Sequence, residues 1–86
     1  MDSYRIEWKH SAIKELRKLP NEVISRVIVA IEDLATNPLP SGVVKLAGAQ
    51  YTYRIRIGDY RVIYTINEPV LLIEIVRVRH RREVYR

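Results

Sequence analysis

The chain has 86 residues, no cysteine and a formal net charge of +5. This length fits one domain over residues 1–86, and the missing cysteines exclude a disulfide framework and cysteine-ligated zinc. A hydrophobic content of 48% with 3 glycines and 4 prolines is typical of a folded globule. The charged first ten residues do not resemble an apolar signal segment and no apolar run matches a membrane span, so we expect a cytoplasmic protein with no membrane partner.

The basic excess lies entirely in the second half of the chain. Residues 1–43 contain six basic and six acidic residues. Residues 44–86 contain nine basic and four acidic residues, a difference that equals the whole +5. This asymmetry predicts a surface for a polyanion or an acidic partner.

The chain begins with a predicted strand and a short helix. Residues 4–8 alternate between apolar and polar side chains, which predicts a strand with Tyr4, Ile6 and Trp8 facing the core. A helix is then expected from Ser11, as its N-cap, to Leu19, because the following proline stops it.

A second helix is predicted over residues 22–36. Apolar residues recur there at three- and four-residue spacing, Asn21 is expected to cap the helix, and the Asn37-Pro38 pair ends it. The two helices therefore form an αα-hairpin. Residues 37–42, NPLPSG, are rich in helix breakers and are expected to form a loop within the domain.

Three strand-like runs follow, over residues 51–57, 60–66 and 71–78. Gly58-Asp59 predicts a two-residue hairpin turn between the first two runs, which pairs Ile57 with Tyr60 and Arg56 with Arg61. Seven apolar or aromatic residues then share one face of the hairpin: Tyr53, Ile55, Ile57, Tyr60, Val62, Tyr64 and Ile66.

The second turn, around residues 67–70, is expected to extend that apolar face across the third strand. The predicted pairs are Ile66 with Leu71, Tyr64 with Ile73, and Val62 with Ile75. The apolar helix stripes and the apolar sheet face together predict an α+β fold. In it an N-terminal strand and an αα-hairpin precede a three-stranded antiparallel meander, in the order β-α-α-β-β-β, with the helices packed on one face of the sheet.

The other face of the hairpin collects three arginines, Arg54, Arg56 and Arg61. Like charges opposite each other on a sheet cost roughly a few tenths to 1 kcal/mol per pair. A bound phosphate reduces this cost because guanidinium groups match its oxygens. The alternative is a solvated sheet face, with Glu74 partly compensating the charge.

The C-terminal ten residues, RVRHRREVYR, contain five arginines together with His80 and Tyr85. Such a segment is either a disordered basic extension or part of a site. An imidazole can serve as an acid or a base near neutrality, whereas a phenol serves as a base only where cations favour its anion.

Other chemistries find little support in the sequence. His10 and His80 are far apart, the acids do not cluster with metal-ligand spacing, and the glycines form no phosphate-binding loop. A metal-independent site with arginines and a proton carrier suits RNA cleavage, in which the 2′-hydroxyl attacks its own phosphorus. On the residues alone, a ribonuclease and an anion-binding domain both stay open.

Three motifs carry a resemblance to a known family: KLAG at 45–48, YRIRIGDYRVIY at 53–64 and HRREVYR at 80–86. With them the whole chain resembles the RelE/ParE superfamily of type II toxin-antitoxin toxins, nearer the RelE branch. The resemblance implies a translation inhibitor that acts as a ribosome-dependent endoribonuclease and cuts mRNA in the A site without a metal or other cofactor.

The resemblance also implies roles for particular residues. Arg61 and Arg81 would stabilise the phosphate in the transition state, and Tyr85 would act on the 2′-hydroxyl or stack on a base. Positions matching Arg54 and Arg56 are lysines in the best-studied members, and a guanidinium is a poor base. Proton transfer then falls to His80 or Tyr85, and the remaining expected RNA-binding residues are Arg54, Arg56, Arg79 and Arg82.

Toxins of this family are held inactive by a cognate antitoxin, and they reach operator DNA only through that complex. The resemblance therefore implies an antitoxin, the ribosome and mRNA as partners. Two alternatives remain: a ParE-like toxin that inhibits DNA gyrase, and a non-catalytic nucleic-acid-binding module.

Overall fold

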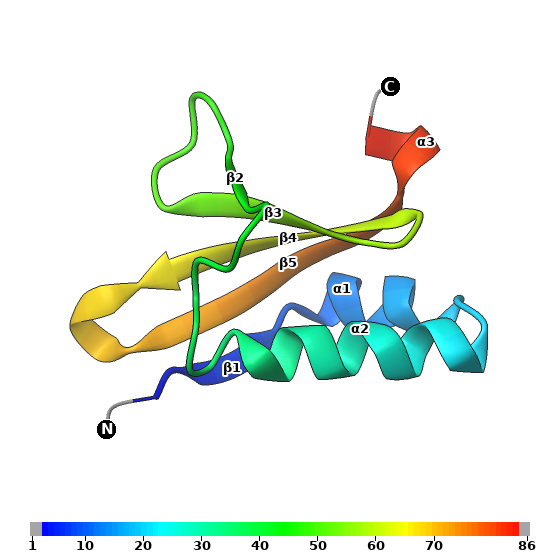
Figure 1. Cartoon of the computed structure of the whole chain (residues 1–86), viewed down its shortest axis with the longest axis horizontal. Coiled ribbons are helices and arrows are strands. Elements are labelled where there is room, and N and C mark those ends of the chain that lie inside the picture. Colours follow the sequence, from blue (N-terminus) through cyan, green and yellow to red (C-terminus); the bar gives the residue numbers. More distant parts are fainter. Residues whose placement is uncertain (1–2, 85–86) are drawn as a thin grey trace.

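The fold is a five-stranded sheet with two helices on one face. The computed structural model describes residues 3–84, and the side chains of residues 3–82. The elements in chain order are β1 (Arg5–Trp8), α1 (His10–Arg17), α2 (Asn21–Asp33), β2 (Val44–Lys45), β3 (Thr52–Ile57), β4 (Tyr60–Asn67), the 3-10 turn η1 (Glu68–Val70), β5 (Leu72–His80) and α3 (Arg81–Val84). Helices α1 and α2 lie on the same side of the sheet (Figure 1), which confirms the predicted α+β class.

The sheet contains two strands beyond the predicted meander. Its order is β1-β5-β4-β3-β2, and β1 lies parallel to β5 with Ile6 opposite Ile73 and Trp8 opposite Ile75. The αα-hairpin leads the chain from β1, at one edge of the sheet, to β2 at the opposite edge, and β5 then pairs with β1. Strand β2 has two exposed residues, too few for a period-two pattern to be visible in the sequence.

Both predicted helix caps are wrong. Helix α1 begins at His10 with Lys9 as its N-cap residue, so Ser11 lies inside the helix, and α2 begins at Asn21 after Pro20. Neither cap residue forms a side-chain hydrogen bond, and both are non-helical, with φ −63° and ψ 144° at Lys9 and φ −58° and ψ 148° at Pro20. Helix α2 ends at Asp33, three residues before the predicted end, and residues 34–36 form turns. The two helices therefore start without the side-chain capping that the sequence predicted.

The predicted register of the first hairpin is confirmed at every pair. Arg56 lies opposite Arg61, and the pairing continues from Ile57–Tyr60 to Thr52–Thr65. Gly58 has φ +60°, and a Cβ at this position would lie 2.9 Å from Nη2 of Arg26 on α2. Glycine suits this turn because of its positive φ, and a Cβ there would also require the end of the Arg26 side chain to shift.

The predicted register of the second hairpin is wrong by two residues near the turn. Ile66 pairs with Ile73, and Tyr64 with Ile75, because η1 and the left-handed Leu71 (φ 51°) lengthen the connection. A bulge between Ile63 and Tyr64 then adds one residue to β5, so that Val62 pairs with Val78. The even shift and the bulge together keep the apolar residues on the core face.

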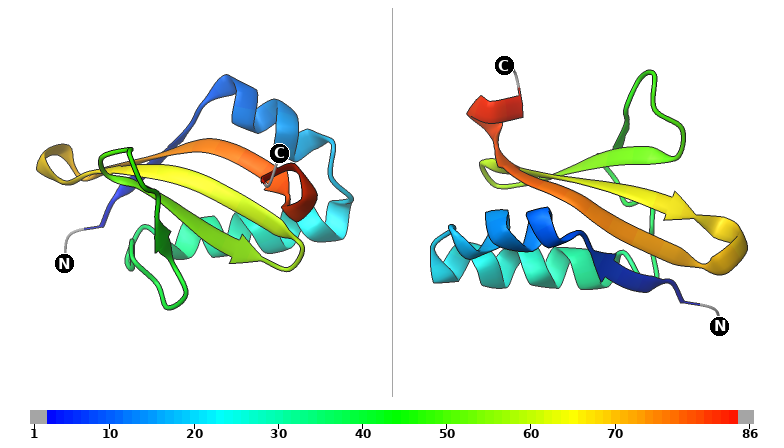
Figure 2. Two further views of the ribbon diagram at one scale, coloured as in Figure 1. Left: turned by 90° about the horizontal axis from the view of Figure 1, so that it is seen from above. Right: turned by 180° about the vertical axis from the view of Figure 1, so that it is seen from behind.

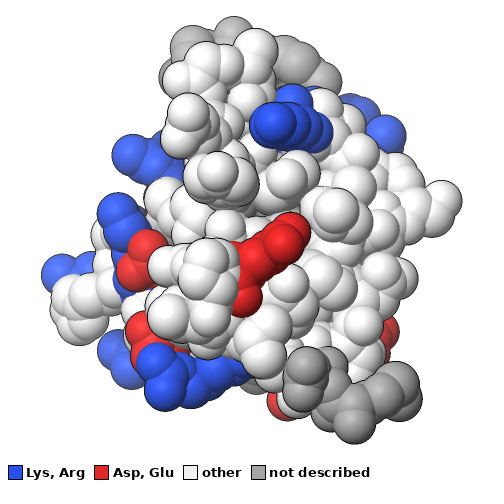
Figure 3. Space-filling view, turned by 90° about the vertical axis from the view of Figure 1, so that its left-hand side faces the viewer, with Lys and Arg blue, Asp and Glu red and all other residues white. Residues whose placement is uncertain are grey.

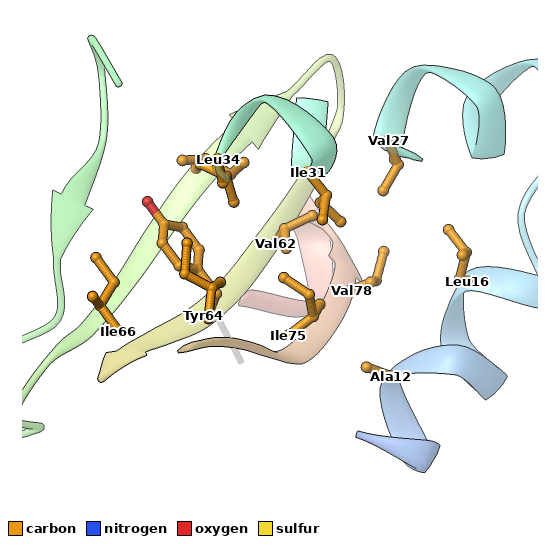
Figure 4. Close-up of a cluster of buried hydrophobic side chains, with 12 residues drawn as sticks. Ala12, Leu16, Val27, Ile31, Leu34, Val62, Tyr64, Ile66, Ile75 and Val78 are labelled. Carbon is orange, nitrogen blue, oxygen red and sulfur yellow. The ribbon is translucent and has the colours of Figure 1, made fainter. Parts of the chain in front are cut away.

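The core lies between the helices and the sheet (Figure 4). Its fully buried side chains come from both layers, and the largest are Tyr64, Ile31, Leu34, Ile73, Ile75, Val27 and Val62. The hydroxyl group of Tyr64 donates a hydrogen bond to the carbonyl oxygen of Pro38 at 2.7 Å. This bond ties the loop after α2 to the central strand, and it satisfies the one polar atom of the buried ring.

Candidate nucleic-acid interface

Strand pairing arranges five arginines in two rows across the sheet. Arg56, Arg61 and Arg79 form one row, on β3, β4 and β5, and Arg54 and Arg77 flank Ile63 in the next. We call these residues the arginine rows. They alternate along the strands with the buried residues Ile55, Val62 and Val78, so they belong to the face that α1 and α2 leave uncovered.

Arg61, at the centre of the first row, is only 7% exposed. The sequence predicted an open sheet face at this position, and the burial of Arg61 departs from that expectation. It lies on the central strand of the sheet between Arg56 and Arg79, so neighbours flank it on both sides. A cation in such surroundings interacts with a bound anion under weaker solvent screening than a surface arginine does.

Arg56, in contrast, is exposed, and its side chain folds toward the hairpin turn. Its Nε donates a hydrogen bond to the carbonyl oxygen of Gly58 at 3.1 Å. This bond restricts the guanidinium group to the turn end of the sheet, beside Arg61 in the same row. Arg54 lies one row away and is partly buried.

The C-terminal segment returns to the same end of the sheet. Strand β5 extends to His80, and the backbone N–H of Arg81 donates to the carbonyl oxygen of Asp59 at 2.7 Å. Nε of Arg81 also lies 3.9 Å from Oδ1 of Asp59. Helix α3 rises from the sheet on the side away from α1 and α2, next to the β3–β4 turn (Figures 1 and 2). The backbone of residues 77–84 is thus part of the fold, and Arg81 is bonded to Asp59, two residues before Arg61 in the chain.

His80 lies on the other face of the sheet. It pairs with Tyr60, and the two rings meet edge to face with centroids 5.3 Å apart. Tyr60 lines a hollow of about 250 Å³ together with Val23 and Arg26 of α2. The Nδ1 atom of His80 accepts a hydrogen bond from the backbone N–H of Arg82 at 3.2 Å, as a cap at the start of α3 does.

The structure therefore brings some of the candidate residues together and separates others. Arg54, Arg56, Arg61 and Arg79 share the arginine rows, and Arg81 joins them at the turn. His80 lies apart from the rows, and the exposed Arg82 follows Arg81 in α3. Tyr85 lies outside the described residues.

Glu15 of α1 contacts two residues of the arginine rows, and the sequence did not indicate these contacts. Its Oε2 lies 2.9 Å from Nε of Arg79 and 3.9 Å from Nη1 of Arg77. Its Oε1 accepts a hydrogen bond from the backbone N–H of Val78 at 2.9 Å. These partners are more than 60 residues away in the chain, so no local pattern could have found them.

Charges on the side of the molecule that Figure 3 shows are mixed. At the end that carries the β4–β5 connection, acidic and basic side chains lie among larger uncharged areas (Figure 3). Within residues 3–84, His, Asp and Glu side chains do not gather in groups of three that could hold a metal ion. No helix in this part of the chain is both long and apolar enough to cross a membrane.

Comparison with known proteins connects this arrangement to a family. Residues 6–85 match the family model described as the ParE toxin of the type II toxin-antitoxin system parDE. The chain belongs to the RelE/ParE family of type II toxins. The toxin is 32% identical to Toxin RelG of Mycobacterium tuberculosis over 84 residues, which span 96% of this chain and 97% of RelG.

Solved structures give the same assignment for the fold of the toxin. The RelE–RelB complex from Pyrococcus horikoshii contains a chain that is 33% identical, with a TM-score of 0.83, covering 92% of the toxin and 96% of that chain. The RelBE2 toxin-antitoxin complex from Mycobacterium tuberculosis follows, at 28% identity and a TM-score of 0.80, covering 91% and 98%. Both are complexes of a toxin with its antitoxin.

Proposed function

We propose that this toxin is a metal-independent, ribosome-dependent endoribonuclease that inhibits translation by cutting mRNA. The observation that carries the proposal is the buried Arg61 at the centre of a row of guanidinium groups. Such a row binds a phosphodiester because each planar fork offers paired donors to phosphate oxygens. The RelE and RelG names of the relatives support the same function.

The reaction we propose uses the substrate's own nucleophile. The 2′-oxygen bonds to the adjacent phosphorus as the bond from phosphorus to the leaving 5′-oxygen breaks. One proton leaves the 2′-hydroxyl, and one is delivered to the 5′-oxygen. Negative charge gathers on the phosphoryl oxygens in between, and Arg61 and Arg81 would stabilise it. Arg54, Arg56, Arg79 and Arg82 would hold the flanking RNA backbone.

Proton transfer is best assigned to Tyr85. The imidazole of His80 lies on the Tyr60 side of the sheet, and its Nδ1 already accepts the Arg82 N–H. That geometry favours a structural role for His80, which holds the start of α3 beside Asp59. Of the two proton carriers in the C-terminal segment, Tyr85 then remains for the 2′-hydroxyl.

We further propose that a cognate antitoxin inhibits the toxin and carries it to operator DNA. The structural relatives are toxin-antitoxin complexes, and the net charge of +5 suits a partner with acidic segments. The target would be ribosome-bound mRNA, and the antitoxin would block its access to the arginine rows.

Inhibition of DNA gyrase is the second candidate, because the matching family model is described as a ParE toxin. Two assays on the purified toxin separate the functions: cleavage of mRNA on programmed ribosomes, and supercoiling by purified gyrase. We expect cut mRNA and unaffected supercoiling. Inhibited supercoiling with intact mRNA would establish the gyrase toxin, and intact mRNA bound at saturating protein would establish a non-catalytic binding module.

A further inference from the structure

Glu15 closes an edge of β5 that β1 does not cover. Strand β1 pairs with β5 only between Leu72 and Ile75. Beyond that point α1 lies beside β5, and the carboxylate of Glu15 accepts the backbone N–H of Val78 at 2.9 Å. A side chain thus supplies a bond that a strand would otherwise make, at the place where β5 enters the arginine rows.

The second oxygen of the same carboxylate binds the arginine rows themselves. Oε2 of Glu15 lies 2.9 Å from Nε of Arg79 and 3.9 Å from Nη1 of Arg77. The Glu15 side chain is 23% exposed and that of Arg79 is 30% exposed. An ion pair at this distance and with this limited exposure is less screened by solvent than a fully exposed surface pair.

These contacts hold the Arg79 side chain next to a fixed point of the β5 backbone. One carboxylate binds the backbone of residue 78 and the side chain of residue 79, so the guanidinium plane of Arg79 is set relative to the sheet. In its row Arg79 lies opposite Arg61, and cations in a row repel one another. A negative charge at the β5 end of the row reduces this repulsion and holds Arg79 at the edge of the sheet.

We propose that Glu15 is a positioning residue that presets Arg79 for binding an RNA phosphodiester. The proposal rests on the proposed nuclease function and adds to it a residue from the helical layer, on the far side of the sheet from the bound RNA. Glu15 touches no substrate in this scheme. It acts through Arg79. Because the Arg79 side chain is already ordered before RNA binds, the entropic cost of binding is smaller.

The variant Glu15→Gln separates this role from the support of the β5 edge. An amide oxygen can still accept the N–H of Val78, whereas the charge that holds Arg79 is lost. The matched control is Glu7→Gln, which removes the same charge from an exposed pair in which Glu7 Oε2 lies 3.0 Å from Nη2 of Arg5 on β1.

The test is steady-state cleavage of ribosome-bound mRNA by the wild-type toxin, Glu15→Gln, Arg79→Ala and the double variant. For Glu15→Gln we expect KM to rise about fivefold, with kcat within about twofold of the wild type, because a binding group has lost its order. In the Arg79→Ala background, Glu15→Gln should change neither value further. The control Glu7→Gln should match the wild type.

An unchanged KM in Glu15→Gln, or a rise in KM of the same size in the Arg79→Ala background, would overturn the proposal. The ¹⁵N–¹H signal of Arg79 Nε provides a readout that does not depend on cleavage, and it should exchange faster with water in Glu15→Gln. Cleavage by the wild type with an Arg79 signal unchanged by the substitution overturns this proposal alone. Absence of cleavage by the wild type overturns the proposed function, and this proposal with it.

Discussion

The backbone N–H of Arg81 donates to the carbonyl oxygen of Asp59 at 2.7 Å, and this bond joins the C-terminal segment to the first hairpin turn. Because Gly58 and Asp59 connect β3 to β4, the same turn also fixes Arg56 opposite Arg61. One two-residue turn therefore sets the relative positions of Arg56 on β3, Arg61 on β4 and Arg81 at the start of α3.

Arg61→Ala should reduce mRNA cleavage by about 10²- to 10³-fold, the usual effect of losing a group that stabilises transition-state charge. Growth arrest on expression should disappear with it. Binding to the antitoxin should persist. This binding serves as the folding control, which is needed because the substitution removes a buried side chain. Growth arrest at the wild-type level would remove Arg61 from the mechanism.

His80→Asn should retain cleavage to within about threefold, because asparagine is a good helix cap and can accept the N–H of Arg82 as His80 does. His80→Ala, which cannot accept this bond, should lose more activity. Rates from single-turnover cleavage would show this difference. A large and equal loss in both variants would assign proton transfer to His80 and contradict the structural role given to it here.

Gly58→Ala should destabilise the fold by about 2 kcal/mol, since a side chain at φ +60° is strained and its Cβ would meet Arg26. Gly48→Ala is the matched control, because φ is +78° there and no atom lies within 4 Å of the added Cβ. Urea unfolding would measure both variants. The difference between them estimates the steric contact, and an equal loss would show that Arg26 moves aside without cost.

Tyr64 should make stability fall at high pH. Burial, with a smaller contribution from Tyr53, raises the pKa of Tyr64 to about 12 from an ordinary 10.0. The folded state therefore holds this proton more tightly than the unfolded chain. Its contribution is complete below pH 10 and is lost as pH rises toward 12, by about 2 to 3 kcal/mol in total.

The measurement is the free energy of unfolding of wild type and Tyr64→Phe at several pH values. At pH 7 the variant should be less stable by about 1 kcal/mol, because the hydrogen bond to Pro38 is lost. That difference should shrink or reverse above pH 10. A difference between wild type and Tyr64→Phe that stays constant across this pH range would contradict the assignment.

The sequence predicted the first hairpin well because its turn leaves no freedom. A two-residue connection fixes which residues face each other, and the alternation of apolar side chains then assigns the faces. The predicted register of the second hairpin was wrong for two reasons. Leu71 adopts a left-handed conformation that residue propensities do not indicate, and the alternation of apolar and polar residues does not reveal the bulge in β5.

The tertiary features of the site were beyond sequence reasoning. Arg54, Arg56 and Arg61 were expected on one face from their spacing, whereas the burial of Arg61 depends on its place in the centre of the sheet. The contact of Glu15 with β5 depends on how α1 packs beside that strand, and the helical pattern of the sequence does not contain this information. The separation of His80 from the arginine rows likewise follows from strand pairing. The composition of the C-terminal segment does not reveal that pairing.

The central claim is that the arginine rows hold RNA while its own 2′-hydroxyl attacks the phosphorus. The most direct test uses ribosomes programmed with two mRNAs that differ only by a 2′-deoxy nucleotide on the 5′ side of the cut position. We expect the toxin to bind both complexes and to cleave only the all-ribose mRNA. Equal cleavage of the deoxy template would show that the nucleophile comes from elsewhere and would contradict the mechanism.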